Sequence, residues 1–228
     1  MYQEAHGLYK AALDKVHALF PARLTEHHIY VQELQLQYAE VLIYLNDLEG
    51  AQARLSSSGQ AIEGILGSNH IMVADSLSLF GRVCSLNGHY TQANAVLSKA
   101  HAMYVHAYGD EHPLNSTASL QIAQNLLAPG YYEDAVACEA LAMKLRQRTF
   151  ESSCPATADC LLMRAMILRD IRDYEESRKL FEQTLQIYLT AYGEGSSHYA
   201  DTLMEYGECL RQMGLFKDAE DALVRAVV

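Results

Sequence analysis

The sequence predicts an all-α fold, a right-handed α-solenoid built from stacked helical hairpins. Three observations lead to this prediction. The pattern of side chains repeats every 42 residues through five consecutive blocks without an insertion. Small residues recur at the same three positions of each block, and glycine and proline recur where the helices of a hairpin would end or begin.

The small residues predict where two helices cross, because helices approach closely only where neither carries a bulky side chain. The blocks begin at His28, His70, His112, Cys154 and Ser196. Counting each of these as position 1, the small residues occupy positions 12, 24 and 31. They are Ala39, Ala51, Ser58, Gly81, Ala93, Ala100, Ala123, Ala135, Ala142, Ala165, Ser177, Thr184, Gly207, Ala219 and Ala226.

The ends of the helices follow from glycine and proline. Glycine at position 19, as in Gly88, Gly130 and Gly214, suits the residue just after a helix. Pro113 and Pro155 at position 2 suit the first turn of one. We therefore expect a first helix over about positions 3–17 of each block and a second over about positions 21–39.

One continuous solenoid domain is expected. Residues 1–27 should supply the second helix of a preceding repeat and its linker. The repeats then span 28–69, 70–111, 112–153 and 154–195, with a shortened fifth repeat over 196–228. Both ends of the chain lack the polar outer face that closes a solenoid, so we expect a longer array or a multidomain protein.

The charge, hydropathy and cysteine content of the chain argue against a nucleic-acid partner and against membrane insertion, and they favour a reducing compartment. A net charge of −11 argues against a nucleic-acid partner, which needs a basic surface. No run of apolar residues is long enough to cross a bilayer, so membrane insertion is not expected. The 5 cysteines form no C-x-x-C pair, which favours reduced thiols and a cytoplasmic location.

Two short signatures recur along the chain. Tyr108–Pro113 (YGDEHP) lies between blocks, and Gly130–Ala135 (GYYEDA) and Gly214–Ala219 (GLFKDA) lie between the helices of one block. With these signatures the chain resembles the tetratricopeptide repeat, in the 42-residue form typical of kinesin light chains. The resemblance implies the solenoid fold and a role as a protein-binding scaffold or adaptor.

Catalytic motifs are missing from the sequence. There is no P-loop, G-x-S-x-G or H-E-x-x-H, and no acid, base and nucleophile set, so we expect no enzyme and no cofactor. Glu26, His27 and His28 could recruit a metal ion, but histidine recurs at repeat starts, so no metal is predicted. A redox role for Cys154 and Cys160 is equally disfavoured.

The candidate partner-binding surface follows from the resemblance. In that family the first helices line a concave groove, into which positions 6, 9, 13, 16 and 17 point. Here these positions combine apolar and charged side chains, and contiguous exposed apolar surface usually binds a partner. The candidate groove residues are Leu36, Glu40, Ile43, Tyr44, Arg82, Leu120, Gln124, Leu127, Leu162, Met166, Arg169, Met204, Glu208 and Arg211.

Two functions are compatible with this groove. The first is an interaction module that docks an apolar or amphipathic peptide or helix. Acidic peptides are not expected, because the family's backbone-gripping asparagine at position 9 and its clamp for C-terminal carboxylates are missing. The second is a regulatory, sensor or oligomerisation array attached to another domain, with the groove filled by the same chain. Self-association through the exposed solenoid ends is compatible with both.

Charged residues stand at two packing positions. Position 28 is Leu or Phe in the other blocks but Glu139 in the third, and position 11 holds Arg164 in the fourth. The second helix of one block packs on the first helix of the next, so both residues should face one seam. We expect an ion pair, with Asn125 as a third member, because an unpaired buried charge is very costly. The alternative is that Arg164 extends into water.

Overall fold

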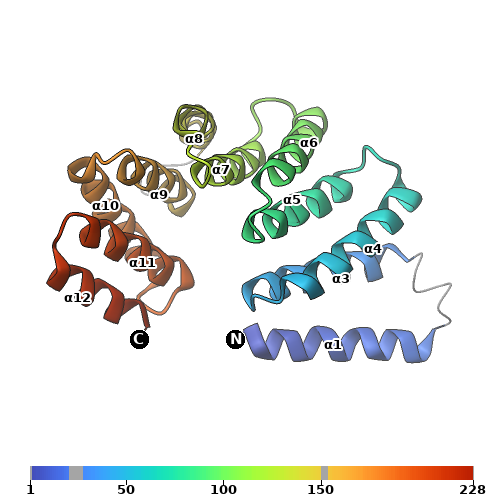
Figure 1. Ribbon diagram of the computed structural model, residues 1–228. Coiled ribbons are helices and arrows are strands. Elements are labelled where there is room, and N and C mark those ends of the chain that lie inside the picture. The colour runs from blue at the N-terminus through green and yellow to red at the C-terminus, as the bar shows by residue number, and fades with distance from the viewer. Residues whose placement is uncertain (1, 21–27, 150–153, 228) are drawn as a thin grey trace. The chain divides into compact units, whose positions relative to one another are not determined.

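The computed structural model describes residues 2–20, 28–149 and 154–227 (Figure 1). Within these residues every regular element is a helix and no strand is present, which confirms the predicted all-α fold. The chain forms two compact units that divide between Glu111 and His112. The linker predicted before residue 28 lies largely outside the described residues, as do Glu26 and His27.

The helices follow one another as hairpins. The first unit contains α1 (Tyr2–Leu19), α3 (Ile29–Tyr44), α4 (Leu48–Leu66), α5 (Ile71–Leu86) and α6 (Tyr90–Tyr108). The second contains α7 (Leu114–Leu127), α8 (Tyr132–Gln147), α9 (Pro155–Asp170), α10 (Tyr174–Tyr192), α11 (Ser197–Gln212) and α12 (Phe216–Val227). Each odd-numbered helix from α3 on is the first helix of a hairpin and packs on the helix that follows it.

These bounds agree closely with the predicted ranges. Four first helices begin one residue earlier than expected, because position 1 is the N-cap. At two of these N-caps the side chain accepts a backbone hydrogen bond: Ser196 from Tyr199 N at 3.3 Å and His70 from Met72 N at 3.2 Å. α8 ends at Gln147 rather than at residue 150.

The turn inside each hairpin requires a left-handed residue at position 19. Gly88, Gly130 and Gly214 have φ of 79°, 84° and 80° there, as their predicted place after the first helix requires. The same turn is made by Asn46 at φ 60° and by Arg172 at φ 69°. Asparagine tolerates this region, whereas an arginine in it is uncommon.

The small residues lie where the helices of a hairpin cross. A Cβ atom added to Gly81 would lie 2.6 Å from Leu97 Cγ, and one added to Gly207 would lie 2.9 Å from Leu223 Cγ. Neither distance is compatible with the present packing. The predicted close approach of the two helices is therefore confirmed at these crossings.

Each unit has two layers of helices. In the first unit α3 lies beside α5, and α4 packs against both; in the second, α7 lies beside α9 and α9 beside α11, with α8 and α10 packed against them. α1 packs on α3, as a second helix packs on the next first helix (Figure 1). The first helices therefore share one face of each unit, which is the face that carries the predicted groove residues.

The predicted ion pair is present at the seam between α8 and α9. Arg164 Nη2 lies 2.5 Å and Arg164 Nε 2.6 Å from Glu139 Oε2. The Glu139 side chain is 1% exposed, whereas that of Arg164 is 38% exposed. Burial raises the pKa of the Glu139 carboxyl, and the Arg164 guanidinium only partly opposes this. Asn125 is buried in α7, and its membership of the cluster stays a prediction.

A second buried arginine was not anticipated. Arg146 occupies position 35, where α6 and α10 carry Tyr104 and Tyr188. Its Nε donates to Ser116 Oγ at 2.8 Å, and its Nη1 contacts Asp159 Oδ2 at 2.7 Å and the Ala156 carbonyl. Because α8, α7 and α9 supply these groups, Arg146 ties three helices together.

None of the helices in the described ranges combines the length and the apolarity needed to cross a bilayer.

Candidate partner-binding face

The predicted groove residues divide into a buried and an exposed set. Leu36, Ile43, Leu120 and Leu127 are buried, so they contribute to the core and offer little surface to a partner. The expectation that these four side chains belong to an exposed groove surface is therefore wrong. The physical reason is that these side chains belong to the packed interior: Leu36 and Ile43 lie in the apolar core cluster of the first unit with Leu42, and Leu120 and Leu127 are buried in α7.

Met204, at the same repeat position as Leu120 but on α11, is 50% exposed. On the adjacent α9, Leu162 and Met166 are partly exposed and pack on the buried cluster of Ala165, Phe181 and Cys209. In the second unit these three side chains are the apolar part of the predicted groove that a partner can reach.

The first unit presents an aromatic and charged cluster instead. Tyr44 is exposed at the end of α3, with the Arg82 guanidinium 5.4 Å from its ring centroid. Arg82 Nη1 lies 3.5 Å from Glu40 Oε1, and Tyr2 stacks on Tyr44 with ring centroids 4.7 Å apart. A partner would meet a cation–π pair and an aromatic stack here.

Charged pairs flank the apolar side chains of α9 and α11. Arg169 is 9% exposed, with Nη1 2.5 Å from Glu205 Oε2 and Nε 2.9 Å from Asp170 Oδ1. Arg211 binds both carboxylate oxygens of Glu208, at 2.6 and 2.7 Å. The hydrogen bonds from Arg211 hold the pKa of Glu208 at about 2, so this carboxylate is charged at neutral pH.

A polar pocket of about 510 Å³ opens where the hairpin turns of the second unit meet these arginines. It contains the predicted Arg169 and Arg211, and also Asp170 and Gln212, which occupy groove position 17. The pocket residues that sequence reasoning did not place in the groove are Tyr132, Arg172 and Tyr174. The two tyrosines occupy position 21 and were interpreted as structural. Arg172 carries the one signal that could have found the pocket: it stands where three other turns have glycine.

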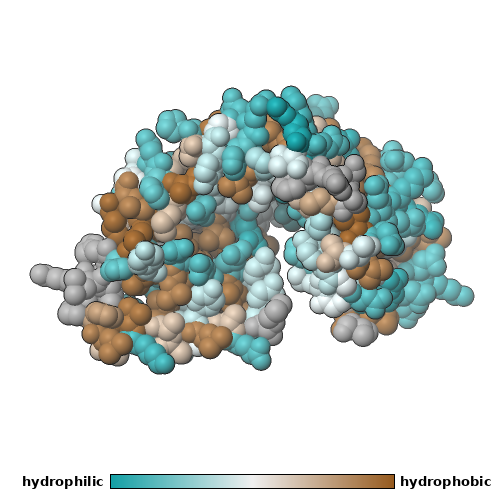
Figure 2. All heavy atoms as spheres, turned by 180° about the vertical axis from the view of Figure 1, so that it is seen from behind, coloured by the Kyte–Doolittle hydropathy of each residue, from teal (hydrophilic) through white to brown (hydrophobic). Residues whose placement is uncertain are grey.

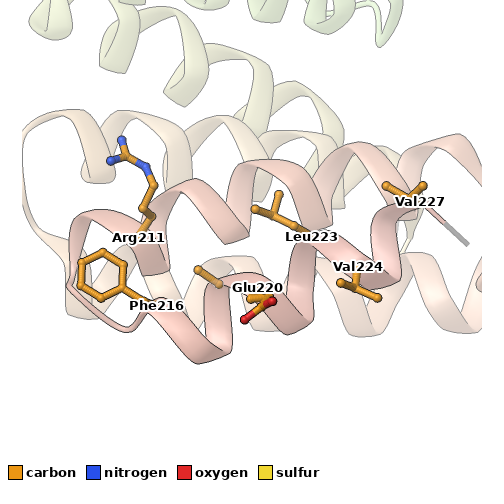
Figure 3. A pocket seen from close by; sticks show the side chains of 7 residues that line it. Arg211, Phe216, Glu220, Leu223, Val224 and Val227 are labelled. Carbon is orange, nitrogen blue, oxygen red and sulfur yellow. The ribbon is translucent and has the colours of Figure 1, made fainter.

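An apolar surface is exposed on α12. Figure 3 shows Phe216, Leu223, Val224 and Val227 projecting from successive turns of this helix, with Arg211 beside Phe216. They line a pocket of about 610 Å³. Leu223 is 42% exposed, whereas Leu55, Leu97 and Phe181, at the same repeat position, are at most 2% exposed. Hydrophilic residues cover much of the face in Figure 2, with apolar patches between them.

No group of three or more metal-ligating side chains was found among the described residues. The five cysteines are free thiols. Cys160 is fully buried, and burial raises the pKa of its thiol to about 11, which keeps it protonated and unreactive. This argues against the redox alternative for Cys154 and Cys160.

Comparison with known proteins identifies the repeats. The family model described as tetratricopeptide repeat matches residues 156–227. These residues are tetratricopeptide repeats. The match covers α9 to α12, and the same helical spacing continues through α3 to α8. No curated protein matches the chain in sequence.

Solved structures extend the likeness to the whole chain. BtubC (BKLC) from P. vanneervenii is similar with a TM-score of 0.68 and 15% identity, over 99% of this chain and 89% of that one. TPR-like repeats of a Podospora anserina kinesin light chain-type protein are similar with a TM-score of 0.62 and 18% identity, over 87% and 94%. A Rap protein complexed with Competence and Sporulation Factor has a TM-score of 0.77 and 15% identity, over 96% and 57%. The predicted tetratricopeptide-repeat fold, with kinesin light chain-like repeats among its neighbours, is therefore confirmed.

Proposed function

We propose that this chain is a protein-interaction module, a scaffold or adaptor that docks an apolar or amphipathic segment on its first helices. The observation that carries the proposal is the half-exposed Met204 on α11 and the partly exposed Leu162 and Met166 on the adjacent α9, two helices that also carry the charged pairs of Arg169 and Arg211. An apolar anchor inside a charged rim is the usual anatomy of a binding surface. The Rap protein crystallised with Competence and Sporulation Factor gives a precedent for a binding role on this fold.

Replacing Met204 by Asp tests this face. We expect binding of a synthetic amphipathic helical peptide, selected for affinity to the wild-type chain, to weaken by about tenfold or more, because a carboxylate would have to be desolvated at the contact. The measurement is fluorescence anisotropy of the labelled peptide, with circular dichroism to verify the fold. Leu120 is unsuitable for this test because its burial makes a charge there unfold the helix pair.

The matched control is Leu141→Asp, which places the same charge on an exposed apolar residue of α8, a second helix. It should leave peptide binding unchanged. Equal binding by the wild type and Met204→Asp would refute docking on the α9–α11 face.

The alternative, an oligomerisation or regulatory array, is favoured by the apolar face of α12. We propose that this face supports self-association, because Leu223 is 42% exposed and lines an apolar pocket on α12 with Phe216, Val224 and Val227. Val224→Asp, at a residue 59% exposed, should convert a concentration-dependent oligomer to a monomer in multi-angle light scattering, whereas Leu141→Asp should not. A wild type that stays monomeric at high micromolar concentration would contradict this alternative.

A cytoplasmic location is proposed from the five free cysteines, since thiols persist in reducing compartments. We propose no catalytic role, no cofactor and no nucleic-acid partner. This rests on the absence of catalytic motifs from the sequence and on the net charge of −11.

A further inference from the structure

Arg172 stands at a position where the backbone favours glycine. It closes the turn between α9 and α10 with φ 69°, and the same turn is made by Gly88, Gly130 and Gly214 elsewhere in the chain. A side chain with a Cβ atom is disfavoured in this conformation. The fold alone would therefore be better served by glycine here.

Within the described residues, no hydrogen bond or ion pair of the Arg172 side chain offsets this strain, and the side chain is exposed. The other two arginines of the pocket are both paired with carboxylates. Arg169 is bound by Asp170 and Glu205, and Arg211 by Glu208. Arg172 is thus the uncompensated cation of the pocket. A strained residue without a structural role points to a functional one.

Further donors line the same cavity of about 510 Å³. Tyr132 and Tyr174 are both half-buried, and in the described part of the chain neither hydroxyl makes a hydrogen bond. Both can therefore donate to a ligand. Gln212 and Asp170 are already engaged, by Glu208 and Arg169. The pocket therefore offers one free guanidinium and two free hydroxyl donors.

We propose that this pocket binds one carboxylate, supplied by an Asp or Glu side chain of the docked segment. A guanidinium matches a carboxylate with two parallel hydrogen bonds. A single negative charge is favoured over a phosphate dianion, because Asp170, Glu205 and Glu208 already surround the pocket arginines. The proposal rests on the proposed interaction function. It amends the expectation that acidic residues are avoided: one acidic side chain on an otherwise apolar or amphipathic segment fits this pocket.

The test uses a small probe, so that its result does not depend on the peptide-binding face. N-acetyl-glutamate amide is titrated into the ¹⁵N-labelled chain, and the Arg172 Nε–Hε resonance is followed by NMR. The uncharged N-acetyl-glutamine amide and inorganic phosphate, at matched ionic strength, form the other arms. We expect a saturable shift with the glutamate compound only.

The deciding variant is Arg172→Gly. Because this variant lacks the arginine side-chain resonance, its binding of the glutamate compound is followed by NMR through the backbone amide resonances of α9 and α11. Because glycine suits the turn, this variant should melt about 2–4 °C higher while its affinity for the glutamate compound falls about tenfold or more. Arg178→Gln, at an exposed arginine paired with Glu182, is the control and should bind normally. Unchanged affinity in Arg172→Gly, an equal response to the glutamine compound, or tighter binding of phosphate would each overturn the carboxylate assignment. None of these outcomes would bear on docking at Met204.

Discussion

Arg164→Leu is expected to lower the free energy of unfolding by about 3–5 kcal/mol at pH 7. The variant leaves the Glu139 carboxylate, whose side chain is 1% exposed, without the guanidinium that contacts it at 2.5 Å. Replacing the other partner, in Glu139→Leu, should lower the free energy of unfolding by less. In Glu139→Leu the Arg164 side chain, already 38% exposed, can turn its charge to water, and Leu occupies the equivalent position in α4 and α6.

The pH dependence of Arg164→Leu follows from the direction of the Glu139 shift. Burial raises the pKa of Glu139 above its ordinary value of about 4.3, and Arg164 opposes that rise, so removing Arg164 raises the pKa further. Between the unfolded and the folded pKa the folded chain binds more protons. The free energy of unfolding of the variant should therefore fall as the pH rises through this window and recover as the pH falls.

Urea unfolding at pH 7 and pH 5 measures both effects. The double variant Glu139→Leu/Arg164→Leu should be close to the wild type or more stable, because apolar replacement of a buried pair is often neutral or favourable. A cost below about 1 kcal/mol for Arg164→Leu, or the same cost at both pH values, would contradict a buried carboxylate that depends on Arg164.

The fold could be predicted because equivalent side chains recur at a constant spacing along the sequence. A period of 42 residues aligns every crossing, so exceptions such as Glu139 and Arg164 stood out and their contact followed from the packing order. Exposure could not be predicted in the same way. Leu120 and Met204 share position 9, yet Leu120 is 8% exposed and Met204 is 50% exposed. A repeat pattern gives equivalent positions equal weight and says little about which neighbour is present.

The turn pocket was missed for a related reason. A pattern analysis interprets Tyr132 and Tyr174 as structural because they recur, although both line a pocket together with Arg172. In the sequence, Arg172 was notable only because it occupies the turn position that is glycine in three other repeats. Sequence reasoning did not single out Arg146, because position 35 is not constant among the repeats: it is Ile62, Tyr104, Arg146 and Tyr188. The structure therefore adds most information at the residues that depart from the repeat pattern.

Arg146 is the residue at which the second unit should be most sensitive, together with the Glu139 seam. Its guanidinium is buried and contacts Ser116 of α7, and the Ala156 carbonyl and Asp159 of α9. Asp159 also accepts a hydrogen bond from Tyr188 Oη at 2.5 Å, so α10 joins the same network. One side chain on α8 therefore satisfies polar groups on both neighbouring first helices.

Arg146→Leu is expected to lower the free energy of unfolding by about 1.5–3 kcal/mol, since it removes charge-assisted hydrogen bonds to Ser116, the Ala156 carbonyl and Asp159. The cost is limited because the Asp159 side chain is 39% exposed and Ser116 Oγ still donates to the Pro113 carbonyl. Arg146→Lys keeps the charge but not the planar fork, so it should recover only part of that loss.

The control is Tyr104→Phe in the first unit, which removes one hydrogen bond of 2.7 Å to Asp75 at the equivalent position and should cost about 0.5–1.5 kcal/mol. Urea unfolding followed by circular dichroism compares the three variants. If Arg146→Leu costs no more than Tyr104→Phe, the arginine does not hold α7, α8 and α9 together, and packing of the small-residue crossings alone accounts for the stability of this unit.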